Sequence, residues 1–244
     1  MPKSFNQKLK ILYLMQAFME RTDREHPMSV PDLILYLDGY GISVERKTVY
    51  EDIETLRIFG MKIENRREKP SGYYLADRDF SFSELKILMD AVQSSRFITE
   101  RQSRELVRKL EHLTSISEAK RLQSQTSVLS GSKAVNREIY DSIQKICDAM
   151  ADNRQICFNY YEWDFSRELK PKRDGARYRV SPWKMIWNNE NYYLIGLDER
   201  NGIVKHYRVD KIMHVSIESQ KRNGEDIFRN FDFPKYVSGT FGMF

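Results

Sequence analysis

The sequence holds few residues suited to metal or redox chemistry. Only two cysteines occur among 244 residues, Cys147 and Cys157, and neither stands in a CxxC or Cys/His ligand spacing. Ligand spacing is also absent from the four histidines, His26, His112, His206 and His214. We therefore expect no metal site, no bound cofactor and a reducing environment such as the cytoplasm.

Enzyme motifs and membrane-crossing segments are missing as well. The chain has no Walker loop, G-x-G-x-x-G, H-E-x-x-H or G-x-S-x-G motif. No stretch approaches the roughly twenty apolar residues that cross a bilayer. The apolar run Ile11–Met19 is broken by Gln16 and is followed by no small-residue cleavage site. These absences predict a protein that is not an enzyme, has no catalytic residue and has no membrane partner.

The composition predicts a globular protein with a mild preference for polyanions. Hydrophobic residues make up 41% of the chain and aromatic residues 12%, which is enough to bury sizeable cores. Lys and Arg number 40 against 35 Asp and Glu, so the net charge is +5 and the pI is near 9.0. This excess is compatible with a nucleic-acid partner but is too small to identify one.

Residues 1–80 show three helical patterns followed by a basic hairpin. Ser29 is a suitable N-cap for the second helix, and Ser43 for the third. The spacing of apolar residues in the third helix predicts a buried stripe of Val49, Ile53, Leu56 and Phe59, which Gly60 closes. Two short strands, 62–65 and 72–75, then flank a loop rich in cations. This order is typical of a winged helix-turn-helix.

The start of the third helix carries the residue types that contact DNA. We expect Arg46 to read a base edge in the major groove. The loop cations would reach an adjacent backbone or minor groove. The full set of expected DNA-binding residues is Glu45, Arg46, Lys47, Thr48, Tyr50, Arg66, Arg67 and Lys69. One charged helix is often only a solvated face, so this prediction depends on helix order, caps and wing together.

The middle of the chain predicts a helical connector. Ser81 or Ser83 can cap one helix and Thr99 another. Residues 123–133, QSQTSVLSGSK, are polar and rich in serine, which is typical of a linker or crossover. An amphipathic helix over 135–150 follows.

Residues 191–212, NYYLIGLDERNGIVKHYRVDKI, read as a β-hairpin with arms 192–197 and 204–212. In the second arm Tyr207 and Val209 fall on one parity, and His206, Arg208 and Asp210 fall on the other. A face that carries imidazole and guanidinium groups beside aromatic rings could bind an anion or a nucleotide. The alternative interpretation is a solvated outer face with the tyrosines in the core.

This hairpin resembles the signature of the WYL domain, named for Trp-Tyr-Leu, whose next strand usually runs close to Arg-x-Phe-Arg-Leu-Asp-Arg-Ile. Residues 156–160 (ICFNY) and 179–182 (RVSP) are similar to the first two strands of that domain. The chain departs from the pattern at Tyr192, which replaces the tryptophan, and at Lys205 and Lys211, which replace arginines. Lysine keeps the charge but lacks the bidentate fork, which puts the ligand geometry of the family in doubt.

The resemblance implies a bacterial transcription regulator with an Sm-like barrel that senses a ligand, in several family members a nucleic acid or a nucleotide. VERKTVYEDIETLRIFGMKI (44–63) also looks like the recognition helix of DeoR-type winged modules, which commonly precede WYL domains. We expect the ligand site to gather Tyr160, Ser181, Tyr193, Lys205, His206, Arg208 and Lys211. Strict alternation cannot place Lys205 and Arg208 on one face of a straight strand, so this grouping requires a bend or a bulge.

The expected fold is a multidomain α+β chain. Its parts are a winged helix-turn-helix (1–80), a helical connector (81–134), a small Sm-like β-barrel or WYL sensor (135–222) and the start of a truncated C-terminal extension (223–244). The apolar tail 231–244, with Phe241, Met243 and Phe244, is expected to pack on a partner or stay mobile.

The expected function is sequence-specific regulation of transcription, with repression as the expected effect. The expected partners are double-stranded operator DNA, a nucleotide or short nucleic-acid effector, and a second copy of the chain in a homodimer. Two alternatives stay open: a single-stranded nucleic-acid binding module acting outside transcription, and an unrecognised nucleotide-processing enzyme.

Overall fold

The structure, a computed structural model, describes residues 7–125, 133, 136–164 and 168–241. It divides into two compact units. The first unit holds the described residues up to Ser94, together with those from Arg104 to the end of the sixth helix. The second holds Ser95–Ser103 and the described residues beyond. Within the described ranges, no helix is long and apolar enough to span a membrane.

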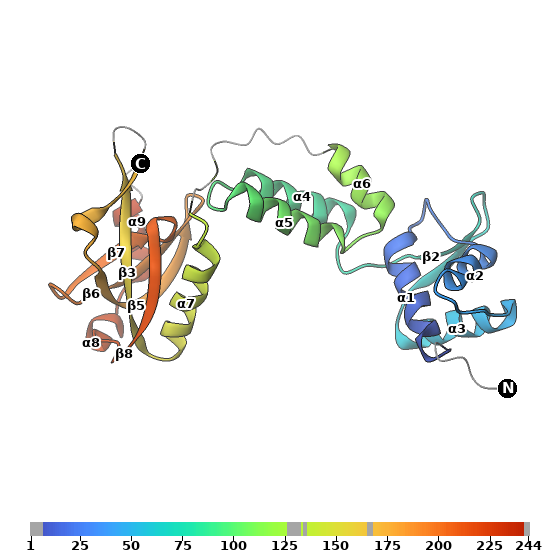
Figure 1. Cartoon of the computed structure of the whole chain (residues 1–244), viewed down its shortest axis with the longest axis horizontal. Coiled ribbons are helices and arrows are strands. Elements are labelled where there is room, and N and C mark those ends of the chain that lie inside the picture. Colours follow the sequence, from blue (N-terminus) through green and yellow to red (C-terminus); the bar gives the residue numbers. More distant parts are fainter. Residues whose placement is uncertain (1–6, 126–132, 134–135, 165–167, 242–244) are drawn as a thin grey trace. The chain divides into compact units, whose positions relative to one another are not determined.

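The first unit contains six α-helices and a two-stranded antiparallel sheet among its described residues (Figure 1). A short 3-10 turn, Gln7–Leu9, precedes the first helix. The elements are α1 (Lys10–Arg21), α2 (Val30–Asp38), α3 (Arg46–Phe59), β1 (Ile63–Arg66), β2 (Gly72–Leu75), α4 (Phe82–Ser94), α5 (Glu100–Glu111) and α6 (Ile116–Gln125). The last eight residues of α5 belong to this unit, and its first four belong to the other.

The helices α1, α2 and α3 share one core with the hairpin. The buried residues of this core are Leu14, Ala17, Phe18, Val30, Leu33, Val49, Ile53, Leu56 and Ile63. The capping box expected at the start of α2 is present, because Ser29 and Asp32 each accept a hydrogen bond from the other's backbone N–H. Gly60 ends α3 in the left-handed conformation, with φ of 116°. One prediction is wrong: Phe59 is 76% exposed and lies outside the buried stripe.

The hairpin gains a third extended segment from the residues before α2. Met28 and Tyr73 exchange two backbone hydrogen bonds of 2.9 and 2.8 Å. The chains approach so closely that a Cβ on Gly72 would lie 2.5 Å from the carbonyl carbon of Met28. Gly72 also has φ of 154°, so this contact requires glycine.

The helices α4, α5 and α6 have a separate core made of Leu85, Met89, Val107 and Leu122. Ser81 caps α4, since its hydroxyl accepts from the Glu84 N–H at 3.3 Å. Thr99 caps α5 in the same way, through the N–H of Gln102. Most of the predicted linker 123–133 lies outside the described residues.

The second unit is a curled antiparallel sheet with α7 (Ile139–Ala151) packed on it (Figure 1). The strand order is β4–β3–β5–β6–β7, and β8 pairs with β3. The strands are β3 (Arg154–Trp163), β4 (Leu169–Pro171), β5 (Tyr178–Asn188), β6 (Asn191–Asp198), β7 (Ile203–Arg208) and β8 (Ile212–Lys221). Two 3-10 turns, Lys172–Gly175 and Val209–Lys211, join β4 to β5 and β7 to β8.

The second arm of the hairpin is shorter than expected. It ends at Arg208 rather than continuing to residue 212, because the chain turns at Val209–Lys211. The buried side chain of Asn136 holds this turn by donating to the carbonyl oxygens of Asp210 and Ile212 at 3.0 and 2.8 Å.

Two short helices, α8 (Glu225–Phe228) and α9 (Phe233–Phe241), follow the sheet. Phe228, with Phe231, Phe233 and Tyr236, packs on Ile195 and its neighbours in the sheet. This packing corrects the expectation that the segment from 231 onward must find a partner or stay mobile, at least through Tyr236. Met243, Phe244 and the side chain of Phe241 lie outside what the structure describes.

Candidate nucleic-acid interface and candidate sensor face

The first turn of α3 presents cations outward. Arg46, Lys47 and Tyr50 are exposed, whereas Val49 and Ile53 on the other side of the helix are buried. Burying an aliphatic side chain contributes about 1.5–3 kcal/mol, so these two residues fix the rotation of the helix about its axis. The outward direction of Arg46 and Lys47 is therefore set by the core.

The same helix start is electrostatically unusual. The expected cap Ser43 does not cap it. Glu45 occupies the N-cap position, with no side-chain hydrogen bond to the helix. The first turn holds no acidic residue, and Arg46 and Lys47 stand at the positive end of the helix dipole. This arrangement costs helix stability, and it concentrates positive potential where an anion would be bound.

Two other members of the expected DNA-binding set have structural contacts. The Thr48 hydroxyl donates to the Glu45 carbonyl oxygen at 2.8 Å. Arg66 donates to the carbonyl oxygen of Arg24 at 2.7 Å and lies 3.5 Å from the Glu25 carboxylate. Arg66 therefore ties the hairpin to the turn after α1.

The remaining cations of the loop are open to solvent. Arg67 and Lys69 are both exposed between β1 and β2. The Tyr50 ring of α3 contacts the Tyr73 ring of β2 edge to face, with 6.3 Å between the ring centroids. The α3 face and the hairpin therefore adjoin, and the exposed set reduces to Glu45, Arg46, Lys47, Tyr50, Arg67 and Lys69.

A buried polar contact joins the turn after α1 to the residue before α6. The Ser115 hydroxyl donates to Asp23 Oδ2 at 2.6 Å, and both residues are buried. Burial alone would raise the pKa of Asp23, but the hydrogen bonds from Ser115 and His26 lower it below its ordinary value. Sequence reasoning missed this pair, because 92 residues separate its members.

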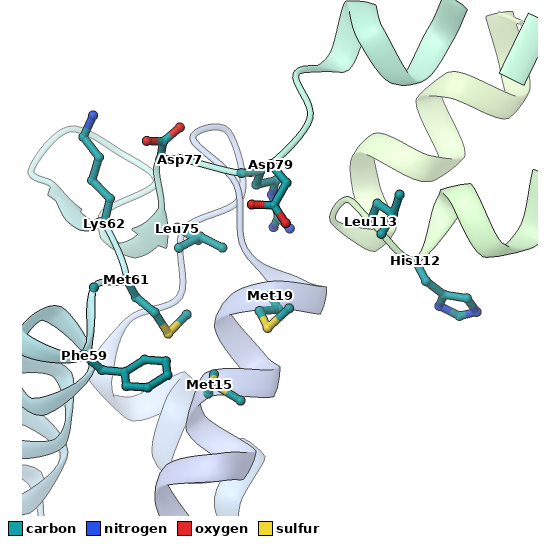
Figure 2. A pocket seen from close by; sticks show the side chains of 12 residues that line it. Met15, Met19, Phe59, Met61, Lys62, Leu75, Asp77, Asp79, His112 and Leu113 are labelled. Atoms are coloured by element: carbon teal, nitrogen blue, oxygen red, sulfur yellow. The ribbon is translucent and has the colours of Figure 1, made fainter. Parts of the chain in front are cut away.

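A hollow of about 410 Å³ lies beside α1 and the C-terminal end of α3 (Figure 2). Met15, Met19 and Met61 line it, together with the exposed ring of Phe59. Thioether side chains adapt to many shapes, so this surface can accommodate varied apolar groups.

In the second unit, three expected ligand residues share one face of the β6–β7 hairpin. Tyr193 pairs with Arg208 across the two strands, and the His206 ring lies 6.3 Å from the Tyr193 ring. The Arg208 guanidinium donates to Asp210 at 3.0 and 2.7 Å and to Asn191 Oδ1 at 2.9 Å. We call Tyr193, His206 and Arg208 the sensor face.

The other four expected ligand residues lie elsewhere. Lys205 is on the opposite face of β7, 2.5 Å from the buried Asp198 carboxylate. Ser181 is fully buried and hydrogen-bonds with Glu199 and the Asn223 N–H. The bend that could have united Lys205 with Arg208 does not occur within β7, because the strand turns only after Arg208.

Tyr160 and Lys211 are both affected by burial. The Tyr160 hydroxyl accepts from the Arg208 N–H at 3.2 Å within a cluster of aromatic rings, and burial raises its pKa to about 12. Lys211 lies in the turn after β7, where burial and the nearby Arg208 charge lower its pKa. The Tyr160 hydroxyl therefore contacts the sensor face through the backbone of Arg208, whereas no hydrogen bond among the described residues joins the Lys211 side chain to that face.

The helix α9 covers part of the sensor face. Tyr236 Oη lies 3.1 Å from His206 Nδ1, and the two rings meet edge to face at 6.1 Å. A ligand that stacks on His206 would therefore compete with this tyrosine. No local pattern predicts this contact, because its two residues are 30 positions apart.

Comparison with known proteins agrees with the architecture of the second unit. The family model of the WYL domain matches residues 141–217, so the chain contains a WYL domain. Among solved structures, the chain is similar to proteasome accessory factor B/C (PafBC) of Arthrobacter aurescens, with 17% identity and a TM-score of 0.31. The match covers 92% of this chain and 35% of that one, and a likeness of this size carries no argument about function. None of the curated proteins matches the chain.

Proposed function

We propose that this chain is a sequence-specific DNA-binding transcription regulator, acting as a repressor, in which a winged helix-turn-helix reads operator DNA and a WYL domain senses a phosphate-bearing ligand. The observation that carries the DNA-binding part is the first turn of α3, where Arg46 and Lys47 face outward at an uncapped helix start. The β1–β2 hairpin, joined by Met28, supports the interpretation as a wing. The WYL domain supports the interpretation as a regulator.

Further parts of this proposal follow from the same chemistry. The chain acts by binding rather than catalysis, in the cytoplasm, and as a homodimer on operators with two-fold symmetry. Its parts are 1–80 for DNA, 81–134 as connector and 135–222 as sensor. The sensor face binds the nucleotide or short nucleic acid, with Arg208 holding phosphate and Tyr193 or His206 stacking a base.

The DNA-binding part is tested with Arg46→Ala and Lys47→Ala on DNA upstream of the chain's own gene. If Arg46 reads a base, its loss costs roughly 1–3 kcal/mol and relaxes preference at one position. Loss of Lys47 weakens binding to all sequences and lowers the salt slope by about one unit. Footprinting and salt titration measure both effects.

Arg108→Ala is the matched control, because it removes an exposed cation from α5 in the same unit. It should leave DNA binding unchanged. If Arg46→Ala and Lys47→Ala behave alike on every DNA, or no better than Arg108→Ala, the assignment of α3 as the reading helix fails.

A further inference from the structure

A hollow of about 600 Å³ lies at the turn end of the β6–β7 hairpin, away from the sensor face. It is five residues along the hairpin from Arg208, since Asp198 pairs with Ile203 and Tyr193 with Arg208. At about 3.3 Å per residue this separation is roughly 16 Å. Four arginines border the hollow: Arg173, Arg177, Arg179 and Arg200.

Two of these arginines are held in place by neighbouring groups. Arg177 donates to the carbonyl oxygens of Cys157 and His214 at 3.0 Å each, and to the Ser216 hydroxyl at 2.8 Å. Arg173 lies over the Tyr178 ring at 4.3 Å. A guanidinium fixed in this way loses little side-chain entropy when it binds a ligand.

The backbone at Arg173 and Asp174 adopts a strained conformation. Arg173 and Asp174 both adopt left-handed conformations, with φ of 55° and 54°. Each costs on the order of 1 kcal/mol for a non-glycine residue. The contact between Arg173 and Tyr178 helps to compensate for this strain.

The carboxylates that line the hollow already accept hydrogen bonds from other groups. Asp198 accepts from Lys205, and Glu199 from Ser181 and Asn223. Glu218 accepts from the Ser216 hydroxyl. Within the described part of the chain, the one ion pair between these carboxylates and the four arginines is Arg173 with Asp198, at 3.9 Å.

Among the other lining residues, Cys157 adds no negative charge to that of the three carboxylates. Burial raises the pKa of its thiol above the ordinary value. The thiol therefore stays neutral at physiological pH. Three guanidinium groups, those of Arg177, Arg179 and Arg200, thus border one hollow without a carboxylate oxygen within 4.0 Å in the described residues.

We infer that this hollow is a second binding site in the WYL domain, separate from the sensor face, and that it takes the phosphate groups of a ligand. The planar forks of arginine match phosphate oxygens in a bidentate manner. The phosphate can belong to a small molecule or to a single-stranded nucleic-acid backbone. Arg173, which stacks on the buried Tyr178 ring, also lines the hollow and offers the flat face of its guanidinium to the ligand.

The test is isothermal titration of the full chain with inorganic pyrophosphate and, separately, with a short oligothymidylate lacking a terminal phosphate. The variant Arg179→Ala/Arg200→Ala should weaken binding by about tenfold or more, which corresponds to about 1.4 kcal/mol. Arg179→Lys/Arg200→Lys keeps the charge but not the fork, and should lose part of the affinity. The control Lys170→Ala/Lys172→Ala removes two exposed cations from the same unit and should bind like the unchanged chain.

Two results support the site and identify the phosphate source. Loss of pyrophosphate binding alone points to a small molecule, and loss of oligothymidylate binding points to a nucleic-acid backbone. Absence of binding by the unchanged chain overturns the inference. An equal loss of binding in Lys170→Ala/Lys172→Ala overturns it as well. So does loss in Arg208→Ala without loss in Arg179→Ala/Arg200→Ala.

Loss of the site can be distinguished from unfolding of the variant and from a change in DNA binding. The side chain of Arg200 makes no hydrogen bond or ion pair among the described residues, so Arg200→Ala alone serves if the double variant unfolds. That single variant should still weaken binding several-fold. Because no DNA duplex is present in these titrations, failure here leaves the role of α3 untouched, and failure of DNA binding leaves this site untouched.

Discussion

Asp198 is the carboxylate on which the end of the β6–β7 hairpin depends. It is 1% exposed and accepts from Lys205 at 2.5 Å, from the Arg200 N–H at 3.0 Å and from the Tyr207 hydroxyl at 3.3 Å. Burial by itself raises the pKa of Asp198, but the hydrogen bonds from Lys205 and Arg200 lower it below the ordinary value. The ionised form is therefore the one that the fold requires.

We predict that Asp198→Asn lowers the free energy of unfolding at neutral pH by on the order of 2 kcal/mol, because a charged hydrogen-bond acceptor is lost. A carboxyl group whose folded pKa is depressed stabilises the fold above its unfolded pKa, near 4, and loses that contribution as the pH falls through the folded pKa. The difference between the variant and the unchanged chain should therefore shrink below about pH 4. Denaturant unfolding at several pH values measures it.

The exposed Asp226 at the start of α8 provides the control. Asp226→Asn should change stability by less than about 0.5 kcal/mol. A loss in Asp198→Asn that does not vary with pH would contradict the role of its charge.

At the scale of elements, the contact between Gly72 and Met28 determines whether the hairpin can lie against the residues before α2. We predict that Gly72→Ala lowers the free energy of unfolding by on the order of 3 kcal/mol, because the added Cβ meets backbone at 2.5 Å and the backbone conformation is strained for alanine. Chemical denaturation of the full chain measures this loss.

The variant Gly41→Ala separates the steric cost of the added Cβ from the cost of the backbone conformation. Gly41 has φ of 71°, but a Cβ there would meet nothing within 4 Å. Gly41→Ala should therefore cost only the conformational part, about 1 kcal/mol. Equal losses for the two variants would show that the close approach to Met28 has no energetic weight.

The sequence predicted those elements whose ends are decided locally. Ser29 with Asp32 and Gly60 act within one turn of the chain, and both helix ends lie where expected. The start of α3 was misplaced because Val44 packs on the core and keeps the chain extended past Ser43. Phe59 has the right spacing for the buried stripe, but its side chain stays 76% exposed at the end of the helix.

The candidate site was predictable in its residue types and only partly in its geometry. Alternation correctly separated Tyr207 from His206 and Arg208. The end of β7 depends on Asn136, more than seventy residues earlier in the chain, and the cover of His206 depends on Tyr236. Partners so distant in sequence leave no local pattern, so the division of the seven expected ligand residues could not be read from the sequence.

At the scale of the whole molecule, the proposed sensor must change DNA binding only when its ligand is present. We predict that Arg208→Ala abolishes the effect of an oligonucleotide effector on operator binding while leaving ligand-free binding nearly intact. Mobility-shift titrations with and without the oligonucleotide measure this. Because Arg208 also bonds to Asp210 and Asn191, thermal unfolding of the variant must accompany them.

His206→Gln provides a second variant, because replacing this imidazole leaves the hydrogen bonds of Arg208 to Asp210 and Asn191 in place. A normal ligand response in both variants would remove the sensor face from the mechanism. Loss of ligand-free operator binding in a folded Arg208→Ala protein would instead show that Arg208 supports DNA binding itself.

The α5 helix restricts how such a chain can be rearranged in evolution. Its start, capped by Thr99, belongs to the second unit, whereas Val107 lies in a core of the first. The chain passes from one unit to the other after Ser94, returns after Ser103, and crosses again beyond α6. A single recombination junction therefore cannot exchange one unit for a foreign one and leave both intact. A foreign segment can replace the residues upstream of α4, provided that the interleaved helices are kept as one piece.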